Sequence, residues 1–344
     1  MKKKALVICP GRGTYNKDEL GYLRRYHADK REFIAAVDAY RAARGQSSIS
    51  ALDGQAKFSL AEHSRGDNAA ALIYACAYAD FLSIDRSKYD VVAVTGNSMG
   101  WYIALACGSA ATPMNALHLI NTMGTLMHEN LSGGQMIYSL VDENWKKING
   151  RRDYLMKLIG DINGKGDCEL YISIEFGGML VFGGNDKALA VLEKTLKAEG
   201  RFPMRLQNHA AFHTPMMRPI SDHALTIMGD DLFQQPSVPL IDGRGAVWQP
   251  HATDIPAIQR YTLGHQVCET YDFTRAVQVS VKEFAPDCLI ILGPGSTLGG
   301  AVAQSLIDIG WQRWQSKDDF TSRQKTDPYI LSMGLEEQRG MVVV

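Results

Sequence analysis

The sequence predicts an α/β fold: a mainly parallel sheet flanked by helices, with a smaller ferredoxin-like subdomain inserted. First, short apolar runs such as residues 5–9 and 91–95 alternate with longer segments of helical periodicity, which is the pattern of βαβ units. Second, the pattern of expected strands and helices changes between residues 134 and 205, where the order is strand, helix, strand, strand, helix, strand. That order is typical of ferredoxin-like folds. The length of 344 residues accommodates one large domain with such an insertion.

The first part of the chain is expected to alternate between strands and helices. Apolar runs predict the strands, and apolar residues that recur on one face predict the helices. Thr112 is a suitable N-cap and Pro113 fits the first helical position, so one helix begins there. The expected strands are 5–9 and 91–95, and the expected helices are 31–44, 68–83, 99–107 and 113–128.

The inserted region and the segment after it complete the predicted order. The insertion contains strands 136–140, 169–174, 179–182 and 204–206 and helices 142–159 and 187–200. After it we expect helices 221–232 and 272–285 and strands 238–242 and 288–292. From Gln315 the chain is polar and weakly periodic, which predicts a loose C-terminal extension over 315–344.

Composition and charge exclude several function classes. The formal net charge of −1 and the pI near 6.8 provide no general attraction to nucleic acid or to anionic membranes. The apolar run 5–9 is too short for a signal peptide, and no segment approaches the roughly 20 apolar residues of a membrane span. We therefore expect a cytoplasmic protein. The six cysteines form no C-x-x-C pair, so they are expected to be reduced thiols.

Residues 96–100, Gly-Asn-Ser-Met-Gly, fit the pattern G-x-S-x-G. In that pattern a strand turns sharply into a helix, and the serine oxygen projects above the sheet at the helix N-terminus. The expected strand before this segment and helix after it supply that context. The backbone N–H of Met99 then points to where an oxyanion would form. Because Gly and Ser are also common in ordinary turns, a purely structural turn stays open for Ser98.

A serine nucleophile needs a base, and His213 is the candidate. It follows the expected strand 204–206 and precedes Thr214-Pro215, which places its ring near the carboxyl edge of a sheet. His209 lies four residues earlier, as in a zinc pair on a helix. Pro215 argues against one helix through both, and no H-E-x-x-H motif is present, so no metal is expected. A histidine satisfied by backbone groups stays the alternative.

Four blocks follow one another along nearly the whole chain: Pro10-Gly11-Arg12-Gly13, Gly96-Asn97-Ser98-Met99-Gly100, Phe212-His213-Thr214-Pro215-Met216-Met217 and Gly293-Pro294-Gly295. In this order they resemble the malonyl-CoA:acyl-carrier-protein transacylase family and the acyltransferase domains of polyketide and fatty-acid synthases. The resemblance implies that residues 1–132 and 206–314 form an α/β-hydrolase-like large domain. Residues 133–205 would then be the ferredoxin-like subdomain, in agreement with the element order.

The resemblance implies a ping-pong acyl transfer with no bound cofactor. His213 would take the proton of Ser98, which attacks the thioester of an acyl-CoA; the phosphopantetheine thiol of an acyl carrier protein then collects the acyl group. The backbone N–H groups of Met99 and Arg12 would form the oxyanion hole. Gln266 matches the family position whose main-chain carbonyl orients the histidine and sets its tautomer. Fatty-acid or polyketide biosynthesis is the implied context.

The sequence also departs from the family pattern. Asn97, Arg12 and Trp101 stand where members usually have histidine, glutamine and glutamate. Malonyl-transferring members carry an arginine 25 residues after the serine, and counting from Ser98 gives Met123. Methionine cannot pair with a carboxylate, and burying that charge unpaired costs several kcal/mol. We therefore expect an acyl group without a free carboxylate; a malonyl carboxylate bound by the Arg12 side chain is the alternative.

The remaining expectations concern the surroundings of the serine. Gly11 and Asn97 are expected to contact the substrate together with Met123. Arg218 follows the His213 block, so we expect it near the cleft, where a basic side chain would favour an acidic carrier protein. An ordinary solvated charge is the alternative at such a position.

Three function classes stay open. The first is transfer to a carrier protein, and the second is an editing hydrolase that removes acyl groups from carrier proteins. These differ in whether water reaches the acyl-serine ester, which no sequence feature reports. The third is a non-catalytic scaffold, against which the presence of both Ser98 and His213 counts.

Overall fold

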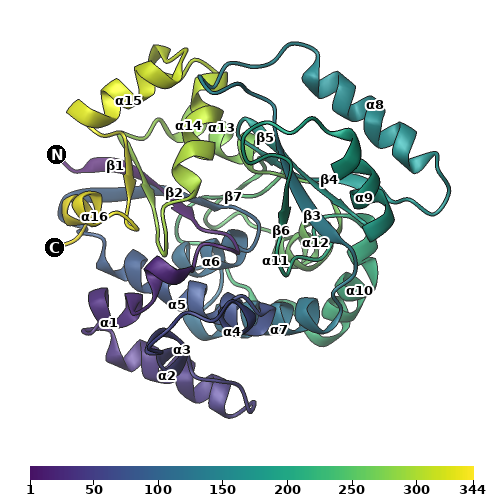
Figure 1. Cartoon of the computed structure of the whole chain (residues 1–344). Coiled ribbons are helices and arrows are strands. Elements are labelled where there is room, and N and C mark those ends of the chain that lie inside the picture. Colours follow the sequence, from purple (N-terminus) through teal and green to yellow (C-terminus); the bar gives the residue numbers. More distant parts are fainter.

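The computed structural model describes all residues 1–344, and its strands form two sheets flanked by helices (Figure 1). The first sheet has the order β11 (Ile330–Ser332), β10 (Cys288–Ile291), β1 (Lys3–Cys9), β2 (Tyr89–Gly96), β7 (Leu240–Ile241) and β8 (Val247–Trp248). All its neighbouring strands are parallel except β7 and β8. Residues 5–9 of β1 are fully buried, as expected for a parallel strand covered on both faces. The predicted α/β class is confirmed.

The second sheet has the order β6 (Met204–Leu206), β3 (Gly134–Ser139), β5 (Met179–Gly184), β4 (Leu170–Phe176) and β9 (Tyr271–Asp272). The first four strands come from residues 134–206 and have the fourth, first, third, second arrangement of a ferredoxin-like sheet. Strand β9 comes from outside that region and pairs in parallel with β4. This strand was not predicted, and it joins the two parts of the fold. The exact boundaries at 133 and 205 stay a prediction.

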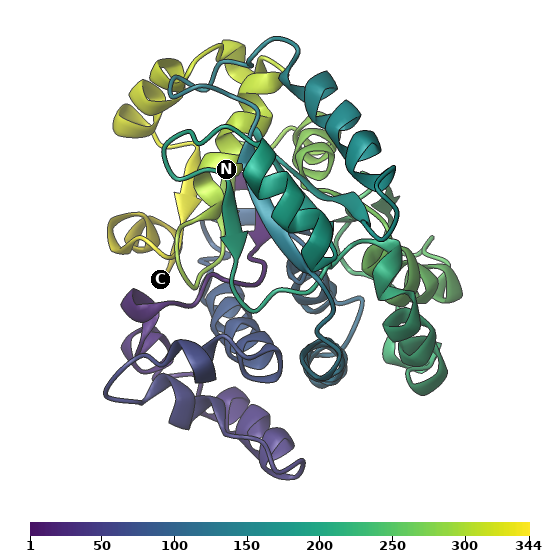
Figure 2. The same cartoon turned by 45° about the vertical axis from the view of Figure 1, so that its right-hand side comes forward.

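Strands β3 and β5 use their two faces differently. Met136 and Phe182 pack in a separate apolar cluster with helices α8 (Arg151–Asn163) and α9 (Asp186–Thr195). The alternate residues Ile137 and Val181 belong to the large core of the molecule. This alternation follows from the two-residue period of a strand. Figures 1 and 2 show α8 and α9 on the outer side of this sheet, so its inner side is free to face the first sheet.

The other helices pack around the first sheet or along its edges. Helices α5 and α6 are apolar on almost all sides and buried, because they lie between other elements. The Thr112 side chain accepts a hydrogen bond from the N–H of Asn115 and caps α7, as predicted. These helices are α1 (Tyr22–Tyr26), α2 (Arg31–Ala42), α3 (Ile49–Asp53), α4 (Leu60–His63), α5 (Gly66–Ser83), α6 (Gly100–Cys107), α7 (Pro113–Glu129), α10 (Arg218–Ile227), α11 (Ile255–Arg260), α12 (Gln266–Cys268), α13 (Phe273–Phe284), α14 (Leu298–Asp308), α15 (Lys317–Thr326) and α16 (Glu336–Val342). None of the helices in the structure has both the length and the apolar character that crossing a membrane requires.

The predicted helix 142–159 is wrong over its first half. The Asp142 carboxylate accepts hydrogen bonds from the N–H groups of Asn144 and Lys146, and an antiparallel bridge joins Val141 to Lys147. Aspartate that bonds to nearby backbone groups in this way competes with helix formation. The helix therefore begins only at Arg151.

The expectation of a loose C-terminal extension at 315–344 is also wrong. Strand β11 pairs in parallel with β10 and so extends the first sheet. Tyr329 and Met333, which flank this strand, are fully buried. The strand has only three residues, too few for a periodic pattern to reveal it in the sequence.

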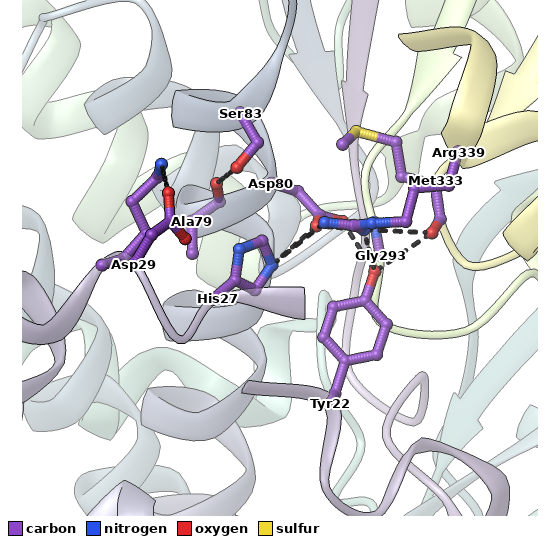
Figure 3. A network of polar contacts seen from close by, with 10 residues as sticks. Tyr22, His27, Asp29, Ala79, Asp80, Ser83, Gly293, Met333 and Arg339 are labelled. Carbon is purple, nitrogen blue, oxygen red and sulfur yellow. Dashed lines mark hydrogen bonds and ion pairs between the residues drawn. The ribbon is translucent and has the colours of Figure 1, made fainter. Parts of the chain in front are cut away.

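A buried polar cluster attaches the C-terminal helix α16 to the rest of the fold (Figure 3). Arg339 on α16 donates a hydrogen bond of 2.6 Å to Asp80 on α5. The same carboxylate lies 2.9 Å from His27 Nε2 and accepts hydrogen bonds from the hydroxyl of Tyr22 and the N–H of Gly293. Asp80 is fully buried, so these partners compensate for its desolvation. The cluster also fixes the glycine-rich loop that begins at Gly293.

We expect Arg339→Ala to destabilise the protein by about 3–5 kcal/mol, because it leaves the buried Asp80 carboxylate without its cation. Urea unfolding followed by circular dichroism measures the loss. Lys187→Ala is the matched control, since the pair of Lys187 with Asp167 is exposed and is expected to contribute less than about 1 kcal/mol. Equal losses in the two variants would contradict this account of the cluster.

Candidate active site

Three adjacent parallel strands end at the same edge of the first sheet. The loop after β1 carries Arg12, the turn after β2 carries Ser98, and the loop after β10 begins at Gly293. Ligand sites in open α/β sheets lie at the carboxyl ends of such neighbouring strands. Parallel pairing therefore brings three of the four sequence blocks together.

The turn at Ser98 requires its two flanking glycines. Ser98 has a φ of 55°, a conformation that residues with side chains rarely adopt and that often marks functional sites. A Cβ on Gly96 would lie 2.3 Å from the carbonyl carbon of Gly100, and a Cβ on Gly100 would lie 2.4 Å from the oxygen of Cys9. No larger residue fits at either position. The G-x-S-x-G pattern is thus explained by the close approach of β1, β2 and α6.

Ser98 and His213 form a hydrogen bond of 2.7 Å between Oγ and Nε2. On the other side of the ring, Nδ1 lies 2.5 Å from the carbonyl oxygen of Gln266. A carbonyl can only accept, so Nδ1 carries the hydrogen and Nε2 presents its lone pair to the serine hydroxyl. Burial lowers the pKa of His213 to about 4, although the bond to Gln266 opposes this shift. The imidazole is therefore neutral at pH 7 and can accept a proton from Ser98.

Gln266 is held in place by its position and by its side chain. It lies in the short helix α12, which ends at Cys268, so its carbonyl lacks a partner within the helix and is free to accept from the histidine. Its Nε2 donates to the carbonyl oxygen of Ser98, and its Oε1 accepts from the hydroxyl of Tyr102. One residue thus orients both the histidine and the serine turn. The sequence did not predict this role of Tyr102, because nothing distinguishes it from the other apolar residues of α6.

The backbone N–H groups of Met99 and Arg12 donate no hydrogen bond within the protein. Met99 precedes helix α6, which begins at Gly100, and Arg12 follows β1. N–H groups at a helix N-terminus favour negative charge. Both groups are therefore free to donate to an oxygen atom that becomes charged beside Ser98.

A cavity of about 320 Å³ opens beside these groups. Ser98, Met99, His213, Gln266 and Arg12 all line it. The rest of its wall is mostly apolar and comes from α7 and from the inner side of the second sheet. Examples are Met123, Met127, Ile137, Ile174, Phe176 and Val181. A volume of this order is at the lower end for small-molecule sites.

The predicted substrate contacts are only partly brought together. Met123 is buried, and it lines the cavity together with Asn97. Gly11 lies against Asn97, whose carbonyl oxygen would be 2.7 Å from a Cβ on Gly11, but it is not part of the cavity wall. Arg218 is also outside the cavity and makes a 3.4 Å contact with Glu269 at the surface. Gly11 therefore acts through packing of the loop. Arg218 does not line the cavity, and its place near the cleft stays a prediction.

Trp101, which departs from the expected family pattern, is part of the packed interior. Its side chain is fully buried and its indole N–H donates to the hydroxyl of Thr262. Its ring packs edge-on against Tyr261, with 5.2 Å between the ring centroids. Trp101 thus packs α6 against the segment that leads into Gln266, and it does not line the cavity.

Two close-packed helices place Met123 in the wall. A Cβ on Gly66 of α5 would lie 2.6 Å from the oxygen of Gly124 on α7, and a Cβ on Gly124 would lie 2.7 Å from the oxygen of Gly66. Only glycine permits this approach. The side chain next to Gly124 is therefore brought against the cavity.

Two arginines are the cationic residues of the cavity wall. Arg201 is exposed at its edge, whereas Arg12 is partly buried. The Arg12 guanidinium donates to the carbonyl of Ser64 and lies 5.5 Å from the centroid of the Phe212 ring. Burial lowers the pKa of Arg12 to about 10, so it remains a cation at neutral pH.

The comparisons with known proteins agree with this architecture. No protein-family model matches the chain. The chain is 23% identical over 325 residues to the phenolphthiocerol synthesis polyketide synthase type I Pks15/1 of Mycobacterium marinum, covering 88% of this chain and 14% of that protein. It is 22% identical over 249 residues to the malonyl CoA-acyl carrier protein transacylase of Salmonella typhimurium, covering 71% of this chain and 72% of the relative.

Solved structures establish the fold. The malonyl-CoA:ACP transacylase of Synechocystis sp. PCC 6803 matches with a TM-score of 0.72 at 16% identity, covering 99% of this chain and all of the other. A malonyl-transacylase in complex with the acyl-carrier protein of a type II polyketide synthase matches with a TM-score of 0.69 at 19% identity, covering 89% and 93%. The chain therefore has the fold of the malonyl-CoA:ACP transacylases. The resemblance predicted from the four sequence blocks is confirmed.

Proposed function

We propose that this protein is an acyltransferase that moves an acyl group from acyl-CoA to the phosphopantetheine thiol of an acyl carrier protein, in fatty-acid or polyketide biosynthesis. The observation that carries the proposal is the 2.7 Å contact of Ser98 Oγ with a histidine nitrogen whose lone pair is free to accept a proton. The names of the similar proteins point to the same reaction class. The retained serine and histidine argue against a scaffold role.

In the first half-reaction, His213 Nε2 accepts the proton of Ser98 while Oγ attacks the thioester carbonyl carbon. The N–H groups of Met99 and Arg12 donate to the oxyanion of the tetrahedral intermediate. The carbon–sulfur bond then breaks, and the CoA sulfur leaves with the proton from His213. In the second half, His213 deprotonates the carrier thiol, the sulfur attacks the ester carbonyl, and Ser98 recovers its proton.

We propose further that the acyl group has no free carboxylate. Met123 lines the cavity, whose wall is mostly apolar, and counting 25 residues from Ser98 assigns Met123 to the family's arginine position. A carboxylate placed there without a cation would lose several kcal/mol of solvation. The alternative is malonyl transfer with Arg12 as the cation, which its partly buried guanidinium in the cavity favours.

We propose an acyl carrier protein as the partner. The support is that one similar structure is a malonyl-transacylase in complex with an acyl-carrier protein. Arg201 is an exposed cation that lines the cavity, which the phosphopantetheine arm would have to enter to reach Ser98. Opposite charges of this kind favour association with acidic carriers.

Transfer and hydrolysis differ in the fate of the acyl group. The protein is labelled with radioactive acetyl-CoA, freed of excess donor, and mixed with either a holo acyl carrier protein or the same carrier without its phosphopantetheine. We expect label to move to the holo carrier within seconds to minutes, and to stay on the enzyme with the apo carrier. Rapid release of free acetate in both mixtures would instead support the editing hydrolase.

A further inference from the structure

His209 faces the same cavity and has a fixed tautomer. The Ser173 hydroxyl donates to the carbonyl oxygen of Phe212 at 2.7 Å, so its oxygen can only accept from the amide N–H of Gln135, 2.5 Å away. The Gln135 carbonyl oxygen therefore points the other way, toward Nδ1 of His209 at 2.6 Å. Because this oxygen can only accept, Nδ1 of His209 carries the hydrogen.

The other ring nitrogen, Nε2, consequently has a lone pair. This nitrogen has no hydrogen-bond partner within the protein and is not fully buried. It is therefore open to the cavity that His209 lines. Burial, together with the nearby positive charge of Arg12, lowers the pKa of His209 to about 3. At neutral pH, His209 is thus an uncharged hydrogen-bond acceptor.

Arg12 lines the same cavity as this acceptor and offers hydrogen-bond donors there. Its guanidinium makes one hydrogen bond within the protein, to the carbonyl of Ser64, and its other N–H groups have no partner. Asn208, the neighbour of His209, donates to the Ser64 hydroxyl. Ser64 therefore binds the side chains of both Arg12 and Asn208. The ring centroid of His209 lies 5.6 Å from that of Phe212, and the guanidinium carbon of Arg12 lies 5.5 Å from the same centroid.

We infer that the cavity accepts an acyl group that carries a hydroxyl, an inference that rests on the proposed function. A hydroxyl accepts and donates hydrogen bonds, so it fits between an N–H of Arg12 and the lone pair of His209. A methylene group would leave both unpaired, which costs free energy in a desolvated site. A carboxylate would satisfy Arg12 but would turn an oxygen lone pair toward His209.

The test compares the acylation rates of four donors: butyryl-CoA and its 2-, 3- and 4-hydroxy derivatives. Each reaction is followed by quenched-flow mixing and measurement of the intact-protein mass. We expect one hydroxy isomer to acylate the wild-type protein about ten-fold faster than butyryl-CoA, the effect of one or two hydrogen bonds. His209→Asn retains a side-chain N–H for Gln135 and lacks the atom that faces the cavity. We expect it to reduce that preference to less than two-fold, because it slows the preferred hydroxy donor more than it slows butyryl-CoA.

His118→Asn is the matched control. His118 binds the Tyr40 hydroxyl and lies outside the cavity, so its variant is expected to keep the full preference. Equal rates with all four donors would overturn the inference. So would a His209→Asn protein that slows every donor equally, because the histidine would then contact the pantetheine arm, which all donors share. If no donor acylates the wild-type protein, the proposed function itself fails and this inference fails with it.

Discussion

His213→Ala is expected to slow the formation of the acyl-enzyme by a factor on the order of 10² to 10⁴, the usual contribution of a positioned general base. The reason is that Nε2 of His213 is the only side-chain nitrogen bonded to Ser98 Oγ. Quenched-flow mixing with acetyl-CoA, followed by intact-protein mass, measures the rate. His223→Ala is the control, because His223 is an exposed residue of α10 outside the cavity, and it should acylate at the wild-type rate.

The same base predicts the pH dependence of acylation. The neutral form of His213 accepts the proton, and burial lowers its pKa to about 4. The rate should therefore rise as the pH increases through about 4 and should be constant from about pH 5.5 to 8. A free histidine, with a pKa near 6.5, would instead give a rate that still rises between pH 6 and 7. That outcome, or a His213→Ala protein of undiminished rate, would contradict the role of His213.

Met123→Arg is expected to change the donor preference by at least about 100-fold in favour of malonyl-CoA over acetyl-CoA. An unpaired buried charge costs about 3–5 kcal/mol, and each 1.36 kcal/mol corresponds to a factor of ten in rate. The wild-type protein should prefer acetyl-CoA, because Met123 offers no partner for a carboxylate. Competition between the two donors, with the acylated masses counted after quenching, measures both preferences.

Met114→Arg is the control for that substitution. It lies on the same helix α7, but its side chain is exposed, so the donor preference should not change. If Met123→Arg folds poorly, the preference of the wild-type protein between acetyl-CoA and malonyl-CoA still tests the role of Met123. A wild-type protein that prefers malonyl-CoA would contradict the role of Met123 and would support Arg12 as the carboxylate partner.

The sequence predicts the site best where the chemistry depends on local geometry. The turn at Ser98 needs small residues on both sides, so it leaves a short pattern that can be recognised without the fold. Met123 depends on a family resemblance, since only the family pattern gives meaning to the position 25 residues after Ser98. Gln266 depends on the same resemblance, because a main-chain carbonyl has no signature of its own in the amino-acid sequence.

Interactions that depend on strand register could not be predicted. Gln135 and Ser173 lie on β3 and β4, and they meet only because β5 sets the register between these strands. The tautomer of His209 follows from that contact, so the sequence could argue only against a zinc pair at this position and gave no role for the histidine. The pairing of Arg339 with Asp80 was missed for a related reason, because it joins residues more than 250 positions apart and no local pattern reports such a contact. Strand β11, which pairs with β10, was missed because its three residues are too few for a periodic pattern.

The location of the acyl group after mixing with acyl-CoA shows directly whether Ser98 is the nucleophile. The protein is incubated with acetyl-CoA, butyryl-CoA and malonyl-CoA in turn, digested, and mapped by peptide mass spectrometry. The account predicts one added acyl group on Ser98 of the wild-type protein and none on Ser98→Ala. Label that persists at another residue in Ser98→Ala, or a folded wild-type protein that none of the three donors acylates, would contradict it.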